Sequence, residues 1–487
     1  MMAALGWAAV LWPFFVHGAE LPPRLEKVPC WFTVTEPMRV RCARMHVAQV
    51  RGTSPAREID FPVVIFESTA KERKSDAVLI PGGGGPGNAM GLTQNRIEGL
   101  WRMHDWILAS GRDAVLMDPR GVGLARPTLA CREFTAIVPQ LWSRHNSAVE
   151  ELALTLQALQ ACKTRLQGEG IDLNAYHTDA MVADIEELRR ALDIPQWNIY
   201  GTSYGANLAY AVAQNYPDRV RSVILDSFQP PDVRFFDRYA QTVSRAFTSL
   251  FELCRSDAGC VRDYPNLDKI VARLVEQADA QPLRLTVAHP YTLEPFPMVV
   301  SGLSLLAVLR SALYSEDDVG ALPEIIYAVA RGSTDLLAPL LRNTLEEDLD
   351  EAYSDGVHFS TNCREEVPFN NMQAAMRQAQ RQPLAAEFMI SVLEYYQAVC
   401  TLWDVAPAPV AGTKTAQINV PALILAGALD PVTPAQWSTQ SPGQFRRVVR
   451  REFAGVGHDV IAGTYCAVIV AESFLDDPER AALDPDC

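Results

Sequence analysis

The stretch Trp197-Asn-Ile-Tyr-Gly-Thr-Ser-Tyr-Gly205 decides the fold of this 487-residue chain. Residues 197–200 have the pattern of a short buried strand, and residues 206–214 have the apolar spacing of a helix. Between them lies a G-x-S-x-G sequence, whose glycines are needed because a Cβ at either flank would clash in so tight a turn. The turn exposes the hydroxyl of Ser203 at the carboxyl end of the sheet. We therefore predict that Ser203 is a nucleophile, the alternative being an ordinary turn.

Short apolar stretches and helical patterns alternate along much of the remaining chain, which indicates a parallel sheet covered on both faces. We expect strands over residues 31–34, 40–50, 59–67, 76–80, 113–117, 197–200, 220–225, 422–426 and 446–453. Helices are expected over residues 178–192, 206–214 and 466–475, with a further helical stretch ending near residue 110. Combined with the serine turn, this order predicts an α/β-hydrolase fold with a mostly parallel sheet.

The alternation stops between residues 230 and 410. Residues 243–254, 267–278, 303–313 and 385–402 have helical patterns, and the linker Val405-Ala-Pro-Ala-Pro-Val410 precedes the return of the strands. We therefore expect residues 20–229 and 411–487 to form the hydrolase core. Residues 230–410 are expected to form a large helical cap inserted into it.

A serine nucleophile needs a base, and the base needs an acid that orients it. In this fold the chain order is Ser, acid, His, and only His289, His358 and His458 follow Ser203. The first two fall within the expected cap, whereas His458 follows the last predicted strand, which makes it the predicted base. Asp430, at the end of the strand around residues 422–426, is the predicted acid. Asp226, which ends the strand over residues 220–225, is the alternative.

The tetrahedral oxyanion of the reaction needs preorganised donors. Tyr204 supplies one backbone N–H as the residue after the nucleophile. The second is expected from Gly84 or Gly85 in the loop Pro81-Gly-Gly-Gly-Gly-Pro-Gly87, whose glycines allow close backbone approach. A phosphate-binding loop is the alternative, but no GK[ST] sequence follows it.

The amino terminus has the pattern of an export signal. Residues 1–19 contain no charged side chain, and an apolar run from Ala3 to Val16 precedes His17-Gly-Ala19. This pattern predicts a signal peptide cleaved near Gly18 or Ala19. The run is short for a membrane span, so we expect no stable span in the mature chain. No Lys or Arg precedes the run, so a misassigned start codon or an uncleaved anchor is the alternative.

The cysteines also favour a periplasmic or secreted location, because all ten follow residue 19 and an even number suggests disulfides. No CxxC pair occurs, and no Cys/His spacing fits zinc, so no metal site is expected. Buried thiols in a cytosolic enzyme are the alternative. Proximity along the chain favours five bridges: Cys30–Cys42, Cys131–Cys162, Cys254–Cys260, Cys363–Cys400 and Cys466–Cys487. The net charge of −15 disfavours nucleic acid and is compatible with neutral or cationic small substrates.

Five motifs occur in an order that resembles one family. They are Gly84-Gly-Pro-Gly87, Asp118-Pro-Arg-Gly-Val-Gly123, the G-x-S-x-G sequence, Ala426-Gly-Ala-Leu-Asp430 and Gly457-His458. Together they resemble the proline iminopeptidase family, and more closely its tripeptidyl aminopeptidase-like branch. The resemblance implies a serine peptidase that releases N-terminal residues or short N-terminal peptides. It also implies that Asp118 and Arg120 brace the active-site loops.

We therefore expect an exported aminopeptidase that acts on a peptide or small acyl substrate without a metal or organic cofactor. The alternatives are a carboxylesterase with the same triad and a catalytically inactive hydrolase fold used for binding. An aminopeptidase must recognise a free ammonium group, for which a nearby carboxylate is the simplest device. Glu365 and Glu366, beside Cys363, are the candidates because the family is understood to use acidic cap residues. A solvated charge pair on a cap helix is the alternative, and the sequence does not indicate an oligomeric state.

Overall fold

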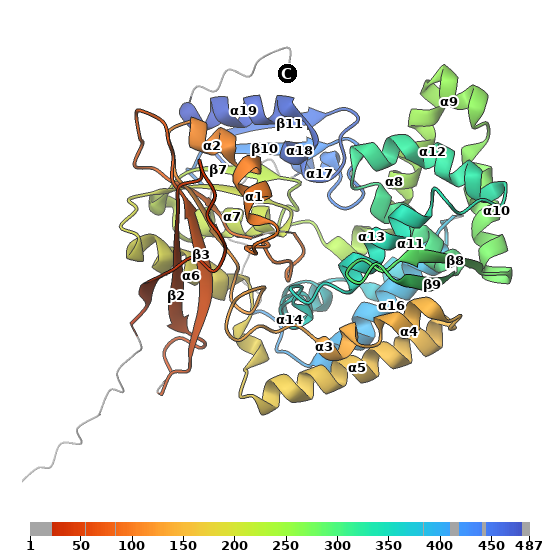
Figure 1. Cartoon of the computed structure of the whole chain (residues 1–487), viewed down its shortest axis with the longest axis horizontal. Helices are drawn as coiled ribbons and strands as arrows, with labels where there is room; N and C mark the ends of the chain where they lie inside the picture. Colours follow the sequence, from red (N-terminus) through yellow and green to blue (C-terminus); the bar gives the residue numbers. More distant parts are fainter. Residues whose placement is uncertain are drawn as a thin grey trace, which may run out of the picture.

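The computed structural model describes residues 22–53, 55–82, 84–382, 384–409, 418–440 and 445–479. The expected signal peptide, residue Gly83 and Cys487 lie outside the described residues. In the described part of the chain, a nine-stranded sheet is flanked by helices, and a large group of further helices lies to one side of it (Figure 1).

The sheet has the strand order β1-β2-β3-β5-β4-β6-β7-β10-β11. The pairs that join β1 to β2, β2 to β3 and β3 to β5 are antiparallel, whereas all pairs from β5 to β11 are parallel. The carboxyl ends of the parallel strands therefore meet at one edge, where such sheets place their functional residues. The strands are β1 Arg24–Val28, β2 Val40–Ala48, β3 Glu58–Phe66, β4 Val78–Ile80, β5 Ala114–Met117, β6 Trp197–Thr202, β7 Val220–Asp226, β10 Ala422–Gly427 and β11 Val448–Phe453.

Each central strand is apolar throughout because both of its faces are buried. In β7, Val223 and Leu225 pack against helices α6 (Thr178–Ala191) and α7 (Tyr204–Asn215). Ile224 points to the opposite face, toward α1 (Ile97–Met103), α2 (Asp105–Ala109) and α19 (Tyr465–Asp476). Successive residues thus serve two separate cores, as the period of two in a strand requires.

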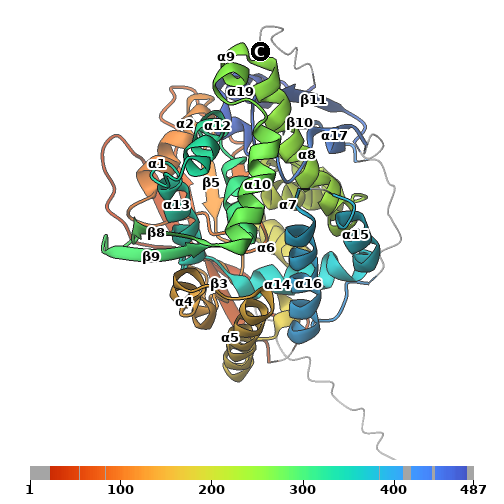
Figure 2. The same cartoon turned by 90° about the vertical axis from the view of Figure 1, so that its right-hand side faces the viewer.

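The chain between β7 and β10 forms a largely helical body with its own apolar core, and this body faces the viewer in Figure 2. We call this body, residues 235–403, the cap. Its helices are α8 Phe235–Ser256, α9 Ala258–Asp263, α10 Leu267–Ala280, α11 Gly302–Ala312, α12 Glu316–Ala330, α13 Ala338–Asp348, α14 Asp355–Glu365, α15 Met372–Ala379 and α16 Ala386–Trp403. It also contains an antiparallel hairpin of β8 (Leu283–Ala288) and β9 (Pro295–Val300).

A segment before the serine turn also packs against the cap. Helices α3 (Arg132–Thr135), α4 (Val138–Ser143) and α5 (Ala148–Gly168) lie along its lower side in Figure 1. Leu159 and Leu166 of α5 share a buried cluster with Val399 and Trp403 of α16. This segment is sequentially part of the expected core, so its packing against the insertion was not foreseen.

Two further short helices, α17 (Ala435–Gln440) and α18 (Val460–Gly463), follow the cap in the chain. One expected strand is wrong: residues 31–34 form no strand, and β1 covers residues 24–28 instead. Trp31 and Phe32 contact each other edge to face, and Trp31 donates to the carbonyl of Leu92 at 2.6 Å. Their apolar character thus reflects tertiary packing rather than strand pairing.

Within the described residues the structure contains four disulfides: Cys30–Cys42, Cys131–Cys162, Cys254–Cys260 and Cys363–Cys400. All four join the cysteines that were paired by proximity. The expected fifth bridge involves Cys487, which lies outside the described residues. No helix in the described ranges combines the length and the apolar character that crossing a membrane requires.

Candidate active site

Ser203 lies on the tight turn between β6 and α7. Its backbone has φ 57° and ψ −123°, a conformation that non-glycine residues adopt only where the surroundings impose it. The Ser203 N–H donates to the carbonyl of Asp226 at 2.9 Å, which ties the turn to β7. A Cβ on Gly201 would lie 2.1 Å from the carbonyl oxygen of Gly205, so only glycine fits there. The turn thus has the geometry that the sequence predicted.

Asp430 and His458 form a hydrogen-bonded pair at the same sheet edge. His458 Nδ1 lies 2.8 Å from Asp430 Oδ2, and the Asp430 side chain is fully buried. The other carboxylate oxygen accepts from the backbone N–H groups of Val432 and Thr433 at 2.7 and 2.8 Å. The hydroxyl of Thr433 donates to Oδ2 at 2.7 Å. These contacts hold the carboxylate in one orientation toward the imidazole.

The pair shifts the protonation of both partners. Burial by itself raises the pKa of Asp430, but the charge and hydrogen bond of His458 and the Thr433 donors bring that pKa below its ordinary value. Burial by itself lowers the pKa of His458, yet the carboxylate of Asp430 raises that pKa above its ordinary value. Asp430 is therefore the ionised member, and it stabilises the imidazolium.

Asp226, the alternative acid, makes different contacts. Its oxygens accept from the backbone N–H groups of Val460 and Ile461, both at 2.9 Å, and from the hydroxyl of Ser227 at 3.0 Å. These bonds cap α18, directly after His458. Burial, with the nearby charge of Asp459, raises the pKa of Asp226. No hydrogen bond between Asp226 and the imidazole of His458 occurs among the described contacts.

The loop of His458 lies next to the serine turn. Asp459 donates its backbone N–H to the hydroxyl of Ser227 at 3.0 Å. The Asp459 side chain accepts from the hydroxyl of Thr202, the residue before Ser203, at 3.5 Å. The predicted base and nucleophile therefore come from adjacent parts of one sheet edge.

The glycine loop after β4 approaches the serine closely. A Cβ on Gly84 would lie 3.2 Å from both the Cβ and the Oγ of Ser203, so a larger residue would crowd the nucleophile. Asp118 follows β5 and accepts from the backbone N–H groups of Met90 and Leu124 at 2.8 and 3.0 Å. It thereby holds the far end of the loop. The Arg120 side chain bonds both oxygens of the buried Asp184, each at 2.6 Å.

The cap holds the glycine loop through His358, a contact that sequence reasoning missed. His358 lies on α14 and makes a hydrogen bond to the backbone of Pro86. Its Nε2 lies 2.9 Å from the hydroxyl of Tyr396 on α16, and the Ser354 N–H donates to the carbonyl of Gly87 at 2.9 Å. Burial lowers the pKa of His358 to about 4. Its position in the insertion excluded it as the base, and no local motif indicated a contact with residues 84–87.

The cap also contacts the loops of the acid and the base. The carbonyl of Tyr314 accepts from the His458 N–H at 3.2 Å, and the two rings lie 5.2 Å apart between centroids. Arg245 on α8 donates to the carbonyl of Ala428 at 2.9 Å, two residues before Asp430. Leu429 is buried in the apolar core of the cap. The cap therefore supports all three loops that carry the predicted catalytic groups.

Glu365 and Glu366 are both largely buried at the end of α14, but their contacts differ. The two oxygens of Glu365 bond the backbone N–H of Thr178, at 2.8 Å, and the hydroxyl of the same residue. That hydroxyl lies 2.8 Å from the hydroxyl of Tyr204. Glu366 accepts from the side chain of Gln229 at 3.1 Å. Burial raises the pKa of each glutamate to about 7.

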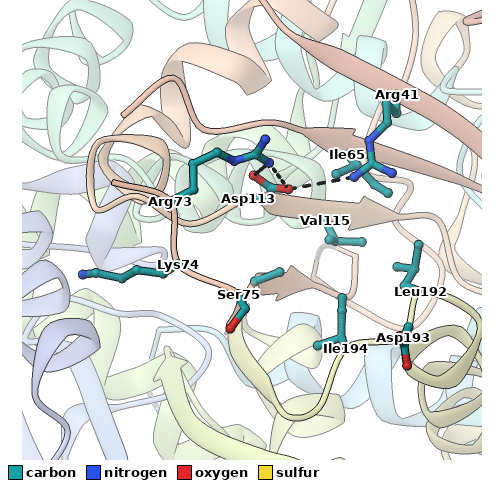
Figure 3. Close-up of a pocket in the computed structure, with 11 residues that line it drawn as sticks. Arg41, Ile65, Arg73, Lys74, Ser75, Asp113, Val115, Leu192, Asp193 and Ile194 are labelled. Atoms are coloured by element: carbon teal, nitrogen blue, oxygen red, sulfur yellow. Dashed lines mark hydrogen bonds and ion pairs between the residues drawn. The ribbon is translucent and has the colours of Figure 1, made fainter. Parts of the chain in front are cut away.

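A surface cavity of about 410 Å³ lies elsewhere, at the amino ends of β4 and β5 (Figure 3). Its cations already have carboxylate partners: Arg73 bonds Asp113 at 2.7 and 2.8 Å, and Lys74 pairs with Asp476 at 2.7 Å. Ser203 is at the opposite edge of the sheet. Across the described residues no group of three His, Cys, Asp or Glu side chains is arranged to hold a metal ion.

Comparison with known proteins gives two family matches. Residues 78–283 match the model described as alpha/beta hydrolase fold, and residues 386–487 match the model described as TAP-like protein. The first segment contains Ser203 and the glycine loop, and the second contains Asp430 and His458.

Three curated proteins are also similar in sequence to this chain. Serine protease Hip1 of Mycobacterium tuberculosis is 25% identical over 420 residues, which are 82% of this chain and 78% of that protein. Tripeptidyl aminopeptidase of Streptomyces lividans is 23% identical over 431 residues, 86% of this chain and 78% of that protein. Proline iminopeptidase of Arabidopsis thaliana is 47% identical over 45 residues, 9% of this chain and 12% of that protein. The chain is therefore a serine peptidase-like α/β-hydrolase, similar to the tripeptidyl aminopeptidase group over most of its length.

Proposed function

We propose that this protein is an exported aminopeptidase that removes N-terminal residues or short N-terminal peptides with Ser203, His458 and Asp430. The observation that carries the proposal is the 2.8 Å hydrogen bond between His458 Nδ1 and the buried Asp430, next to the turn of Ser203. A buried carboxylate on Nδ1 leaves Nε2 unprotonated in the resting imidazole, ready to accept a proton.

In the proposed reaction, Ser203 Oγ attacks the carbonyl carbon of the scissile bond while His458 Nε2 takes the hydroxyl proton. The N–H groups of Tyr204 and of Gly84 or Gly85 stabilise the oxyanion. His458 then gives its proton to the leaving amine, the C–N bond breaks, and an acyl-enzyme remains. Water, deprotonated by the same nitrogen, attacks the ester; the bond from Ser203 Oγ to the acyl carbon then breaks, Oγ takes the proton back from His458, and the acyl fragment leaves as a carboxylic acid. Asp430 stays ionised and stabilises the imidazolium in both steps.

Glu366 is the better supported of the two candidates for binding the substrate's ammonium group. Both oxygens of Glu365 are engaged by Thr178, at the amino end of α6. Glu366 accepts from Gln229, which follows β7 at the edge of the sheet that carries Ser203. We therefore assign ammonium binding to Glu366 and the support of α6 to Glu365. A substrate ammonium would ionise Glu366, since a cation favours the charged form of a buried carboxyl.

Two features support export. The described residues contain four disulfides, and such bridges persist in oxidising compartments. The uncharged apolar run before residue 20 is typical of a signal peptide. A periplasmic or secreted peptidase would meet peptides of external origin.

A substrate panel tests the proposed function. Purified protein would be assayed with aminoacyl and tripeptidyl p-nitroanilides and with p-nitrophenyl esters. We expect anilide hydrolysis, labelling of Ser203 by a fluorophosphonate, and a loss in kcat of about 10⁶-fold in Ser203→Ala. Ester hydrolysis without anilide hydrolysis would instead identify a carboxylesterase. Absence of both labelling and turnover would identify an inactive fold.

The ammonium site has a separate test. Glu366→Gln should raise KM for free-amine anilides about tenfold or more, because a charge-assisted contact is lost. Glu365→Gln is the matched comparison on the same helix, and we expect its main effect on thermal stability. Hydrolysis of p-nitrophenyl acetate should change little in Glu366→Gln. Equal cleavage of N-acetylated and free-amine peptides by the wild type would contradict the aminopeptidase function.

A further inference from the structure

Arg310 is a cation inside the cap that lies among aromatic rings. It occupies the last turn of α11, and its guanidinium carbon lies 5.9 Å from the ring centroid of Tyr239 and 5.8 Å from that of Tyr314. The charge of Arg310 is stabilised by the nearby Tyr314 side chain, which raises the pKa of the guanidinium. The Nε of Arg310 is buried and has no hydrogen-bond partner among the described residues.

In the described part of the chain, no carboxylate forms an ion pair with Arg310. The guanidinium faces the rings of Tyr239 and Tyr314, and Tyr396 is a further neighbour. Burial raises the pKa of all three phenols, so they remain neutral. A neutral ring attracts a cation only weakly compared with a carboxylate. The Arg310 side chain is only partly exposed and its buried Nε has no hydrogen-bond partner within the described ranges, so a carboxylate that reaches the guanidinium would stabilise it.

Arg310 is connected to two parts of the candidate active site. Tyr314, whose ring faces Arg310, contacts His458 through both its carbonyl and its ring. Tyr396, another neighbour, shares a 2.9 Å hydrogen bond with His358, which in turn binds the backbone of Pro86 in the glycine loop. The cation is therefore one side chain away from the predicted base. That base delivers its proton to the leaving amine, so groups beside it lie beside the leaving fragment.

We propose that Arg310 binds a carboxylate on the leaving fragment of the substrate. This inference rests on the proposed function, because Arg310 lies on the leaving-group side of the scissile bond only if His458 is the base. The carboxylate belongs either to the C-terminus of the residue after the scissile bond or to an acidic side chain there. With the substrate's ammonium group at Glu366 and its carboxylate at Arg310, the enzyme would favour short peptides over long chains.

Three matched peptides test the proposal. They share the same N-terminal part, and the leaving residue is alanine with a free carboxylate, alanine carboxamide, or glutamate carboxamide. We expect the wild type to cleave the free acid with a kcat/KM about 10- to 100-fold above that of alanine carboxamide. A high rate for glutamate carboxamide would assign the site to acidic side chains, and a low rate would assign it to the C-terminus.

Arg310→Gln should reduce kcat/KM for the preferred acid to the level of alanine carboxamide, while p-nitroanilide hydrolysis stays near wild type. Arg331→Gln is the matched control, since the exposed Arg331 also lies over a tyrosine ring, 5.6 Å from the centroid of Tyr327. Arg310→Lys, which keeps the charge, should retain part of the preference. Fluorophosphonate labelling at the wild-type rate shows that each variant is folded.

Equal kcat/KM for all three peptides in the wild type would overturn the inference. So would an equal loss for every peptide in a folded Arg310→Gln variant.

A pair of esters distinguishes failure of this inference from failure of the proposed function. The pair consists of the acetyl esters of 4-hydroxybenzoate and of 4-hydroxybenzamide. If no peptide is cleaved but the wild type prefers the benzoate ester and Arg310→Gln does not, the aminopeptidase function fails and the carboxylate site stands. If the esters also react alike, the inference fails.

Discussion

Two buried aspartates lie behind His458, and they hold it in different ways. Asp430 bonds the imidazole itself, whereas Asp226 bonds the backbone of the two residues that follow Asp459. Removing the charge of Asp430 would change the tautomer of the imidazole. Removing the charge of Asp226 would loosen the start of α18.

The first prediction follows from this difference. Asp430→Asn should lower kcat by about 10⁴-fold, because the amide leaves His458 in the wrong tautomer. Asp226→Asn loses one acceptor for a buried N–H group, so we expect it to lower the free energy of unfolding by about 1–3 kcal/mol and to keep much more activity. Steady-state kinetics and urea denaturation of both variants provide the measurement. Near-normal activity in Asp430→Asn together with a folded but inactive Asp226→Asn would reverse the assignment of the acid.

The second prediction concerns the acid limb of the pH–rate profile. His458 acts as a base only when it is neutral, and its pKa is raised by Asp430 against the effect of burial. Activity should therefore fall as the pH drops through a value above the ordinary histidine pKa of 6.5. In Asp430→Asn the residual activity should show this limb at lower pH, because the raising charge is gone. An unmoved limb in kcat/KM for an uncharged ester would show that His458 is not the titrating group.

Helices α14 and α16 together hold the glycine loop that approaches Ser203. α14 carries His358, which binds the glycine loop, and α16 carries Tyr396, which bonds His358. Cys363–Cys400 joins these two helices. The bridge therefore supports the arrangement of the loop that approaches Ser203.

The third prediction compares two bridges of the cap. Cys363 and Cys400 are 37 residues apart, whereas Cys254 and Cys260 are 6 apart. Loop-closure entropy predicts losses in unfolding free energy of about 4 and about 2 kcal/mol when these bridges are replaced by serine pairs. We also expect the first pair alone to lower kcat/KM, because it loosens the contact of α14 with the glycine loop. Equal kcat/KM in both serine variants would show that this bridge does not position the loop.

Several buried carboxyl groups affect the stability of the whole molecule. Burial raises the pKa of Glu365 and Glu366 to about 7 and that of Asp118, Asp348 and Asp355 to about 6. Each favours its protonated form in the folded state. Each group contributes its full stabilisation when the pH is below its ordinary pKa near 4. This contribution is lost as the pH rises through the pKa that the group has in the folded state.

The fourth prediction is therefore a higher Tm in mild acid. We expect the Tm to rise by several degrees from about pH 8 to about pH 6, as protons bind the folded state more than the unfolded state. His177 and His358, whose pKa values burial lowers to about 4, oppose this trend once the pH falls below 6.5. Calorimetry over this range provides the measurement, and Glu366→Gln should flatten the profile. A Tm that falls steadily from pH 8 to pH 6 would contradict the burial of these carboxyl groups.

The sequence by itself determined most of the sheet, the serine turn and the positions of the loops that carry Asp430 and His458. These features depend on short windows: the period of two in a strand and the glycines of a tight turn are visible within about ten residues. The misassigned residues 31–34 show the limit of such windows, because Trp31 and Phe32 pack in an apolar cluster built from distant segments and Trp31 donates to the carbonyl of Leu92, 61 residues away.

The tertiary structure alone decided which aspartate bonds His458, that α5 packs on the cap, and that His358 and Arg310 lie near the candidate active site. These contacts join segments that are far apart in the chain. For example, His358 of the cap lies beside Pro86 of the glycine loop. The apolar period of a helix determines which face is buried but not which helix or loop it meets. That choice depends on how the cap packs as a whole, so no local pattern could reveal it.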